Sequence, residues 1–408
     1  MNSSCLSHGS RWPRTREAGP SHQAVLASLP SRVRSVKRSL TFSGSPHHRG
    51  CVGMRHAIDY GTRELNREAA AMAKYQHNGA GPILEVRDLR THFMTRQGLV
   101  RAVNGVSFEL EKGETLGLVG ESGSGKTITC LSILRLLPRG GQVVGGEIIL
   151  EGQDILKTSE DEMGRLRGKK VGMILQNSMA ALDPVFSIGT QIAEPLVAHQ
   201  GLPWKRALAG AIDLLRMVKI NDPEVRVRNY PHELSGGMRQ RSSSAASIGP
   251  HPDVLIADEP TTALDVTTQR QYLDLLKELQ KATGMAIIFI THDISIVGNL
   301  CDKLAVFYGG LVVEYGSKDQ VLNNPSHPYT KALLKALPIL GEKRERLQTI
   351  PGEPPHAGNL PPACPFHPRC EQAMDNCKEG DAPPIFDLGY GHQARCWLLE
   401  KDDEQYSR

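Results

Sequence analysis

The chain carries, at residues 234–241, the segment Leu-Ser-Gly-Gly-Met-Arg-Gln-Arg. A serine followed by two glycines suits the first turn of a helix, where a hydroxyl and free backbone N–H groups can face an anion. Upstream, residues 120–127 read Gly-Glu-Ser-Gly-Ser-Gly-Lys-Thr, the G-x-x-x-x-G-K-T spacing of a phosphate-binding loop. A single bound nucleotide does not need two separate anion-binding segments in the same chain. We therefore predict that Ser235, Gly236 and Gly237 serve a nucleotide held by a partner.

The phosphate loop has the local context that its chemistry requires. It follows an expected buried strand at residues 115–120 and precedes an expected helix at residues 128–137. Its backbone N–H groups would close around the β-phosphate of ATP, Lys126 would neutralise phosphate charge, and the Thr127 hydroxyl would bind Mg²⁺. The predicted contacts to the nucleotide are Gly120, Ser122, Gly123, Ser124, Gly125, Lys126 and Thr127.

Two acidic residues end the apolar run at residues 254–258. A carboxylate has little structural purpose at the end of a buried strand, so we predict that Asp258 holds Mg²⁺, directly or through water. Glu259 comes next and is placed to polarise the water that attacks the γ-phosphate. The alternative, two solvated acids at a strand end, is weakened by the phosphate loop in the same chain.

Apolar patterning predicts an α/β fold. The continuous runs at residues 254–258 and 285–291 are typical of parallel strands that are covered on both faces. Residues 83–89 and 106–110 alternate like half-buried strands, whereas residues 187–245 read mainly as helices. Strands that alternate with helices favour an α/β core, with a helical insert before residue 234.

These segments, in this order, resemble the ATP-binding-cassette (ABC) ATPases. The resemblance implies an ABC-type ATPase domain at residues 81–320, with a RecA-like core, an antiparallel β subdomain and a helical subdomain at about 178–245. It also implies functions for single residues. Gln176 would contact Mg²⁺ and the attacking water, His292 would touch the γ-phosphate, and Asp265 would lie at the dimer interface. Phe93 is the candidate for stacking on adenine, with a plain core phenylalanine as the equal alternative.

The resemblance narrows to the ATP-binding subunits of dipeptide, oligopeptide and nickel importers. It is carried by residues 119–126, 182–184, 232–241, 257–267 and 325–330, and it covers roughly residues 83–400. It implies ATP hydrolysis coupled to uptake of di- or oligopeptides, with nickel import as the alternative. The implied partners are two integral-membrane permease subunits, a second, non-identical ABC ATPase and an external solute-binding protein. The implied location is the cytoplasmic face of the bacterial inner membrane, as a peripheral subunit.

Hydropathy argues against a membrane-spanning protein, and the charge distribution gives no support for nucleic-acid binding. No apolar run approaches the roughly 18 residues of a membrane-spanning helix. The net charge of +4 comes from the leader, because residues 1–58 carry nine Lys or Arg against one acidic residue. The basic excess therefore gives no argument for nucleic-acid binding. A cassette ATPase that acts on nucleic acid or ribosomes is the alternative function, but such proteins generally have two cassettes or a long coiled-coil insert.

Residues 1–80 are rich in Ser, Arg, His and Pro and lack sustained apolar periodicity. We predict a disordered basic leader, or a start codon assigned too early, with Met54 or Met72 as the start. An Arg- and Ser-rich leader with few acids is also compatible with an organelle transit peptide.

Residues 321–408 are expected to form a small Cys-rich C-terminal domain. Its four cysteines follow the spacing C-x5-C-x6-C-x18-C, whereas structural zinc sites usually contain close Cys-x2–4-Cys pairs. In a reducing compartment such a cluster favours a metal site over disulfides. The segment at residues 364–370 resembles the tail of dipeptide-type importer ATPases, which implies a [4Fe–4S] cluster; zinc and free thiols are the alternatives. The proposed ligands are Cys364, Cys370, Cys377 and Cys396.

The chain departs from the family pattern directly after Arg241. The family continues with an apolar helix, whereas this chain has Ser242, Ser243 and Ser244. Serine has a low helix propensity and competes for backbone hydrogen bonds. We therefore expect a looser helix behind residues 234–241, unless a local reading-frame error produced the serines.

Overall fold

The computed structural model describes residues 81–337 and 349–400, so the predicted leader at residues 1–80 lies outside the described residues. An eight-stranded sheet runs through the molecule in the order β11-β12-β10-β9-β3-β8-β7-β6. Its middle is parallel, because β3 pairs in parallel with β8 and β9, and β7 pairs in parallel with β8 and β6. The parallel strands are β3 (Thr115–Val119), β6 (Val171–Ile174), β7 (Val254–Asp258), β8 (Ala286–Thr291) and β9 (Lys303–Tyr308).

A second sheet packs over one face of the parallel strands. Its four strands are antiparallel and lie in the order β2-β1-β4-β5. A hydrophobic cluster fills the space between the two sheets and surrounds helix α4 (Lys126–Ile133). The strands of this sheet are β1 (Leu84–Thr95), β2 (Gly98–Leu110), β4 (Gly141–Leu150) and β5 (Gln153–Asp154).

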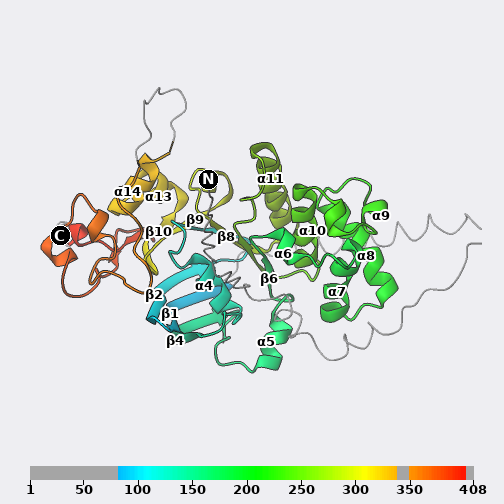
Figure 1. Cartoon of the computed structure of the whole chain (residues 1–408), viewed down its shortest axis with the longest axis horizontal. Coiled ribbons are helices and arrows are strands. Elements are labelled where there is room, and N and C mark those ends of the chain that lie inside the picture. The colour runs from blue at the N-terminus through cyan, green and yellow to red at the C-terminus, as the bar shows by residue number, and fades with distance from the viewer. Residues whose placement is uncertain (1–80, 338–348, 401–408) are drawn as a thin grey trace, which may run out of the picture.

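Helices cover the other face of the parallel strands and form a separate group at one end of the molecule (Figure 1). Helices α7, α8 and α10 pack on one another and carry the helical insert that the sequence predicts. The helices on this side are α6 (Ser178–Ala181), α7 (Ile188–Gln200), α8 (Trp204–Met217), α9 (Pro223–Arg226), α10 (Gly236–Ile248), α11 (Val266–Thr283) and α12 (Val297–Leu300). Helix α5 (Glu160–Leu166) instead packs against the cluster between the two sheets. The α/β core with a helical insert is thus confirmed.

The tail is joined to the core by backbone pairing. Strand β12 (Gln393–Ala394) pairs antiparallel with β10 (Leu311–Ser317), and β11 (Phe386–Asp387) pairs with β12. Helices α13 (Lys318–Asn323) and α14 (Pro328–Lys335) follow β10 in the sequence and lie beside it (Figure 1). The described tail therefore extends the central sheet and shares its hydrophobic core, and the small Cys-rich C-terminal domain stays a prediction.

Helix α4 is shorter than the apolar pattern predicts. The pattern predicts a helix over residues 128–137, whereas α4 begins at Lys126 and ends at Ile133. Arg135 adopts a positive φ of 52°, which ends the helix and directs the chain toward β4. The apolar residues that follow pack against the core without helical backbone, so periodicity alone overestimates the length.

The serine-rich segment is regular helix and is buried. Helix α10 continues without a break through Ser242, Ser243 and Ser244, and all three side chains are buried. Two of these hydroxyls donate to the carbonyl four residues earlier, from Ser242 to Met238 and from Ser244 to Gln240, both at 2.9 Å. Such bonds let a serine stand inside a helix without an unpaired polar group.

Ser244 also connects two helices. Its Oγ lies 2.7 Å from the hydroxyl of Tyr272 on α11, and both residues are fully buried. Because the Ser244 proton goes to the carbonyl of Gln240, Tyr272 is the donor in this second bond. Helix α10 begins after Ser235 and helix α11 begins after Asp265. The buried pair therefore fixes the helix that begins after Ser235 against the helix that begins after Asp265.

We predict that Tyr272→Phe lowers the free energy of unfolding by about 1 kcal/mol, because the buried Ser244 oxygen loses its donor. Ser244→Val should cost more, about 1–3 kcal/mol, since the buried tyrosine hydroxyl loses its bond to Ser244 and the new side chain is apolar. The double variant Tyr272→Phe/Ser244→Ala should cost less than the sum of Tyr272→Phe and Ser244→Ala measured alone. Urea denaturation of the full chain measures these values.

Tyr390→Phe is the matched control, because Tyr390 is fully exposed and loses no buried bond. If Tyr272→Phe is as stable as this control, then the hydroxyl pair does not stabilise the fold.

Candidate nucleotide site

The phosphate loop connects β3 to α4 and depends on glycine at two positions. Gly120 has φ 148°, and a Cβ there would lie 2.2 Å from the carbonyl oxygen of Phe307. Gly125 has φ 107°, and a Cβ there would lie 2.6 Å from the carbonyl oxygen of Ala102. Both positions combine a left-handed backbone with close approach of another strand, which only glycine tolerates.

Lys126 lies folded over the loop. Its Nζ donates to the carbonyl oxygens of Gly120 and Glu121 at 2.7 and 2.9 Å, and to Ser124 Oγ at 3.3 Å. Burial lowers the pKa of this ammonium group, and the carboxylates of Glu259 and Asp258 oppose the shift. The ammonium group thus occupies the loop interior, where its charge is available to incoming phosphates.

Thr127 and Asp258 form an oxygen-rich pair at the start of α4. The Thr127 hydroxyl donates to Asp258 Oδ1 at 3.1 Å, although the two residues are 131 positions apart in the sequence. Asp258 is only 3% exposed, and this burial raises its pKa to about 6, against the hydrogen bond from Thr127. A hydroxyl and a buried carboxylate that face each other are a donor set that suits Mg²⁺.

The carboxylate of Glu259 collects polar groups from separate segments. Its Oε2 accepts from Gln176 Nε2 at 2.9 Å and from the Thr262 hydroxyl at 3.1 Å. His292 Nδ1 lies 3.2 Å from the same oxygen. These residues follow β6, β7 and β8, whose carboxyl ends meet at one edge of the sheet. The structure therefore brings the three predicted catalytic residues together.

Glu259 also has an unusual backbone. Its φ of 41° lies in the left-handed region, which costs a residue with a side chain about 1 kcal/mol or more. Its neighbour Asp258 ends β7 with ordinary strand geometry. The change of backbone directs Glu259 toward Gln176 and His292. Thr262 is the functional candidate that our sequence analysis missed, since a threonine in a turn has no distinguishing pattern.

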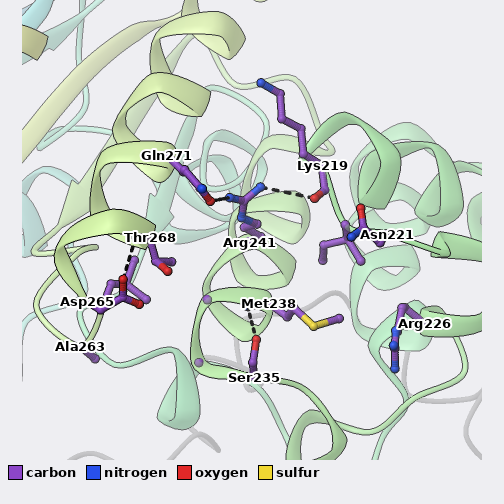
Figure 2. A pocket seen from close by; sticks show the side chains of 14 residues that line it. Lys219, Asn221, Arg226, Ser235, Met238, Arg241, Ala263, Asp265, Thr268 and Gln271 are labelled. Carbon is purple, nitrogen blue, oxygen red and sulfur yellow. Dashed lines mark hydrogen bonds between the residues drawn. The ribbon is translucent and has the colours of Figure 1, made fainter.

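The second predicted anion site, at Ser235, Gly236 and Gly237, forms one wall of a cavity of about 670 Å³ (Figure 2). Ser235 caps α10, its hydroxyl accepting from the backbone N–H of Met238 at 3.3 Å. Asp265 caps α11 in the same way, accepting from Thr268 N–H at 3.0 Å. The other walls include Arg226 and Arg241, two cationic residues that the sequence analysis did not identify, and Lys219, whose ammonium group is paired with Glu278.

The residues that line this cavity come from 219–241 and 263–271, and none belongs to the phosphate loop at residues 120–127. Ser235, Gly236, Gly237 and Asp265 thus lie together, around a space different from the one that faces Lys126. This arrangement fits an anion that the chain's own phosphate loop does not hold.

Phe93 lies on β1, where its ring packs on the backbone of β4. A Cβ at Gly141 would lie 2.6 Å from the Phe93 ring, so a residue larger than glycine would collide with it. The ring is half-buried between the strands. Its stacking on adenine stays a prediction.

The four tail cysteines line one cavity of about 10 Å³, together with His327 and Phe366. This is room for about one water molecule. Burial raises the pKa of Cys364 to about 12 and that of Cys396 to about 11, with the neighbouring thiols adding to both shifts. Within residues 81–337 and 349–400, no group of three or more His, Cys, Asp or Glu is arranged to hold a metal ion. Four thiols could bind a metal ion or cluster as thiolates. Their arrangement in the described residues, however, is not that of a formed metal site.

Two protein families match the chain. The family described as ABC transporter matches residues 103–262, and the C-terminal region of oligopeptide/dipeptide transporters matches residues 313–377. The oligopeptide transport ATP-binding protein OppD of Bacillus subtilis (strain 168) is 47% identical over 322 residues, 78% of this chain and 90% of that protein. The dipeptide transport ATP-binding protein DppD of Lactococcus lactis subsp. cremoris (strain MG1363) is 43% identical over 319 residues, 78% and 91% of the two chains.

A solved structure has the same fold. The ATP-binding cassette MJ0796, in a dimeric post-hydrolysis state bound to ADP and Pi, matches with a TM-score of 0.52 and 24% identity. The match covers 58% of this chain and 98% of that chain. Within the described residues, no helix has the length and apolar character needed to cross a bilayer.

Proposed function

The chain belongs to the family of ATP-binding subunits of oligopeptide and dipeptide ABC transporters, and we propose that it hydrolyses ATP to drive peptide uptake. The observation that carries the proposal is the Glu259 carboxylate, held by Gln176, Thr262 and His292 at the edge of the sheet where the Thr127–Asp258 pair lies. Peptides are the proposed substrate, because both relatives above and the C-terminal family model carry peptide-transport names. Nickel import remains the alternative.

The residues of the loop bind and neutralise the triphosphate. Backbone N–H groups of residues 120–127 surround the β-phosphate, and Lys126 leaves its carbonyl contacts to pair with the phosphate oxygens. Thr127, Asp258 and Gln176 would hold Mg²⁺, which would neutralise charge that develops on the phosphates.

Glu259 orients the attacking water. The amide of Gln176 and the hydroxyl of Thr262 hold its carboxylate, so the side chain does not need to reorganise when water arrives. His292, whose Nδ1 lies 3.2 Å from the same carboxylate oxygen, donates to the γ-phosphate. Glu259 takes up a proton of the water as the water oxygen bonds to the γ-phosphorus, and the bond from that phosphorus to the bridging oxygen breaks, so that ADP leaves.

The cavity of Figure 2 supports a two-subunit arrangement. We propose that Ser235, Gly236, Gly237 and Asp265 bind the nucleotide of a second, non-identical ATPase subunit. Two integral-membrane permease subunits and an external solute-binding protein complete the transporter, and the chain works peripherally on the cytoplasmic face of the bacterial inner membrane. Arg241, on another wall of the cavity, adds positive charge for a partner's phosphates, whereas Lys219 is paired with Glu278.

The tail cysteines form a separate part of the proposal. We propose that Cys364, Cys370, Cys377 and Cys396 bind a [4Fe–4S] cluster with a structural role, because ATP hydrolysis needs no redox chemistry. The support is that four thiols of residues 364–396, three buried and Cys370 partly buried, line one cavity. Thiolate binding would require local rearrangement and loss of the thiol protons.

We predict that Glu259→Gln lowers ATP hydrolysis by the assembled transporter by about 100-fold or more, because the amide cannot take up a proton. Binding of Mg-ATP should persist, since Lys126, Thr127 and Asp258 are unchanged. Phosphate release and equilibrium nucleotide binding measure the two quantities separately. Glu109→Gln is the control, an exposed acid of β2. Hydrolysis at the wild-type rate by Glu259→Gln would contradict the proposal.

Iron and acid-labile sulfide analysis of anaerobically purified chain tests the tail. The expected content is about four of each per chain, with visible absorption that Cys370→Ser abolishes. Cys301→Ala should keep both, because Cys301 is buried in the ATPase core. Zinc in place of iron, or metal-free protein, would contradict the cluster.

A further inference from the structure

The tail reaches the phosphate loop through one ion pair. Arg369 Nη1 lies 2.7 Å from Glu121 Oε2, and Arg369 Nη2 lies 3.0 Å from Glu121 Oε1. The two residues are 248 positions apart, and the Arg369 side chain is only 5% exposed. A two-pronged pair of this kind is stronger and more directional than a single-contact ion pair. Glu121 is the second residue of the loop that surrounds the phosphates.

Besides Glu121, the Arg369 side chain contacts the tail backbone and Tyr308. It ends the short helix at His367–Arg369, between Cys364 and Cys370. Its Nε donates to the carbonyl oxygen of Pro351 at 2.9 Å, and its Nη1 donates to the Tyr308 hydroxyl at 3.2 Å. The guanidinium group also lies 5.8 Å from the centre of the Tyr308 ring. Its position is therefore set by the tail and by the end of β9, independently of Glu121.

The backbone of Glu121 is held by the same region. Its N–H donates to the hydroxyl of Tyr329 on α14 at 3.0 Å. The rings of Tyr308, Tyr329 and Phe366 pack on one another with centroid distances of 4.6–5.3 Å. Both the main chain and the side chain of Glu121 are thus fixed by residues that lie beyond 307.

A carboxylate in this loop presents an electrostatic problem. The Nζ of Lys126 donates to the Glu121 carbonyl oxygen, so the residue lies within the region that receives the phosphates. An unpaired carboxylate there would repel the nucleotide and would be partly desolvated as well. Arg369 offsets both penalties, because its charge neutralises the Glu121 carboxylate and its two N–H groups satisfy both carboxylate oxygens.

We propose that Arg369 is a positioning residue for the phosphate loop: by pairing with Glu121, it lets an acidic residue anchor the loop without weakening ATP binding. This inference rests on the proposed nucleotide site. It makes the C-terminal region a determinant of ATP affinity.

The test measures equilibrium binding to the full chain of a fluorescent ATP analogue that unlabelled Mg-ATP and Mg-ADP displace. Arg369→Gln should raise the Kd for Mg-ATP about tenfold, and should raise the Kd for Mg-ADP less, because ADP carries less negative charge. Glu121→Gln should bind Mg-ATP within about twofold of wild type. The double variant Arg369→Gln/Glu121→Gln should return to the value of Glu121→Gln, since the charge that Arg369 neutralises is gone.

Arg395→Gln is the matched control. Arg395 is also a largely buried arginine of the tail, and it donates to carbonyl oxygens of Pro383 and Gly105 away from the loop. It should leave both Kd values unchanged. Unchanged binding by Arg369→Gln, or losses that add in the double variant, would overturn the inference.

A second pair of variants leaves Arg369 untouched, should its substitution prevent folding. Glu121→Asp keeps the negative charge but draws it back from Arg369, so we expect weaker Mg-ATP binding than for Glu121→Gln. The reverse order would overturn the inference. Lys126→Ala tests the site itself: if it binds Mg-ATP as tightly as wild type, the proposed nucleotide site fails, whereas its loss of binding leaves the Arg369 result to decide this inference alone.

Discussion

The site depends on how the Glu259 carboxylate is held. Two donors, Gln176 and Thr262, and the ring of His292 converge on one oxygen from three connections of the parallel sheet, and the left-handed backbone at Glu259 directs the side chain to them. Such convergence is possible because β6, β7 and β8 are neighbours and parallel, so their carboxyl ends share one edge. The long apolar strands, the covering helices and the loop glycines all serve to keep that edge in place.

Polar groups also fix the elements around the site. Ser244 and Tyr272 connect α10 to α11 where the family pattern would place aliphatic contacts, and Ser247 donates to the Met173 carbonyl of β6 at 2.8 Å. Directional bonds of this kind favour one register of the helix, whereas aliphatic packing would tolerate small shifts. The helix that carries Ser235 is thus held against both the sheet and the next helix.

Local patterns predicted the local parts of this molecule. The phosphate loop, the acids after β7 and the α/β core follow from spacing and apolar runs, because each is written in a few consecutive residues. The contacts that join distant segments could not be predicted from the sequence. Arg369 and Glu121 are 248 positions apart, and β12 joins the sheet through a two-residue strand. No periodicity marks such pairs, and Thr262 or Tyr272 looks like any turn or core residue until the chain is folded.

The central claim is that Ser235 and its neighbours bind a nucleotide that this chain's own phosphate loop does not hold. The direct measurement is photolabelling of the assembled transporter with an ATP analogue that is reactive at its γ-phosphate, using a Lys126→Ala subunit. The account predicts labelling of this chain within residues 219–241, and no labelling of the isolated Lys126→Ala subunit. Absence of label from that segment in the assembled complex, while the second ATPase subunit binds the analogue, would contradict it.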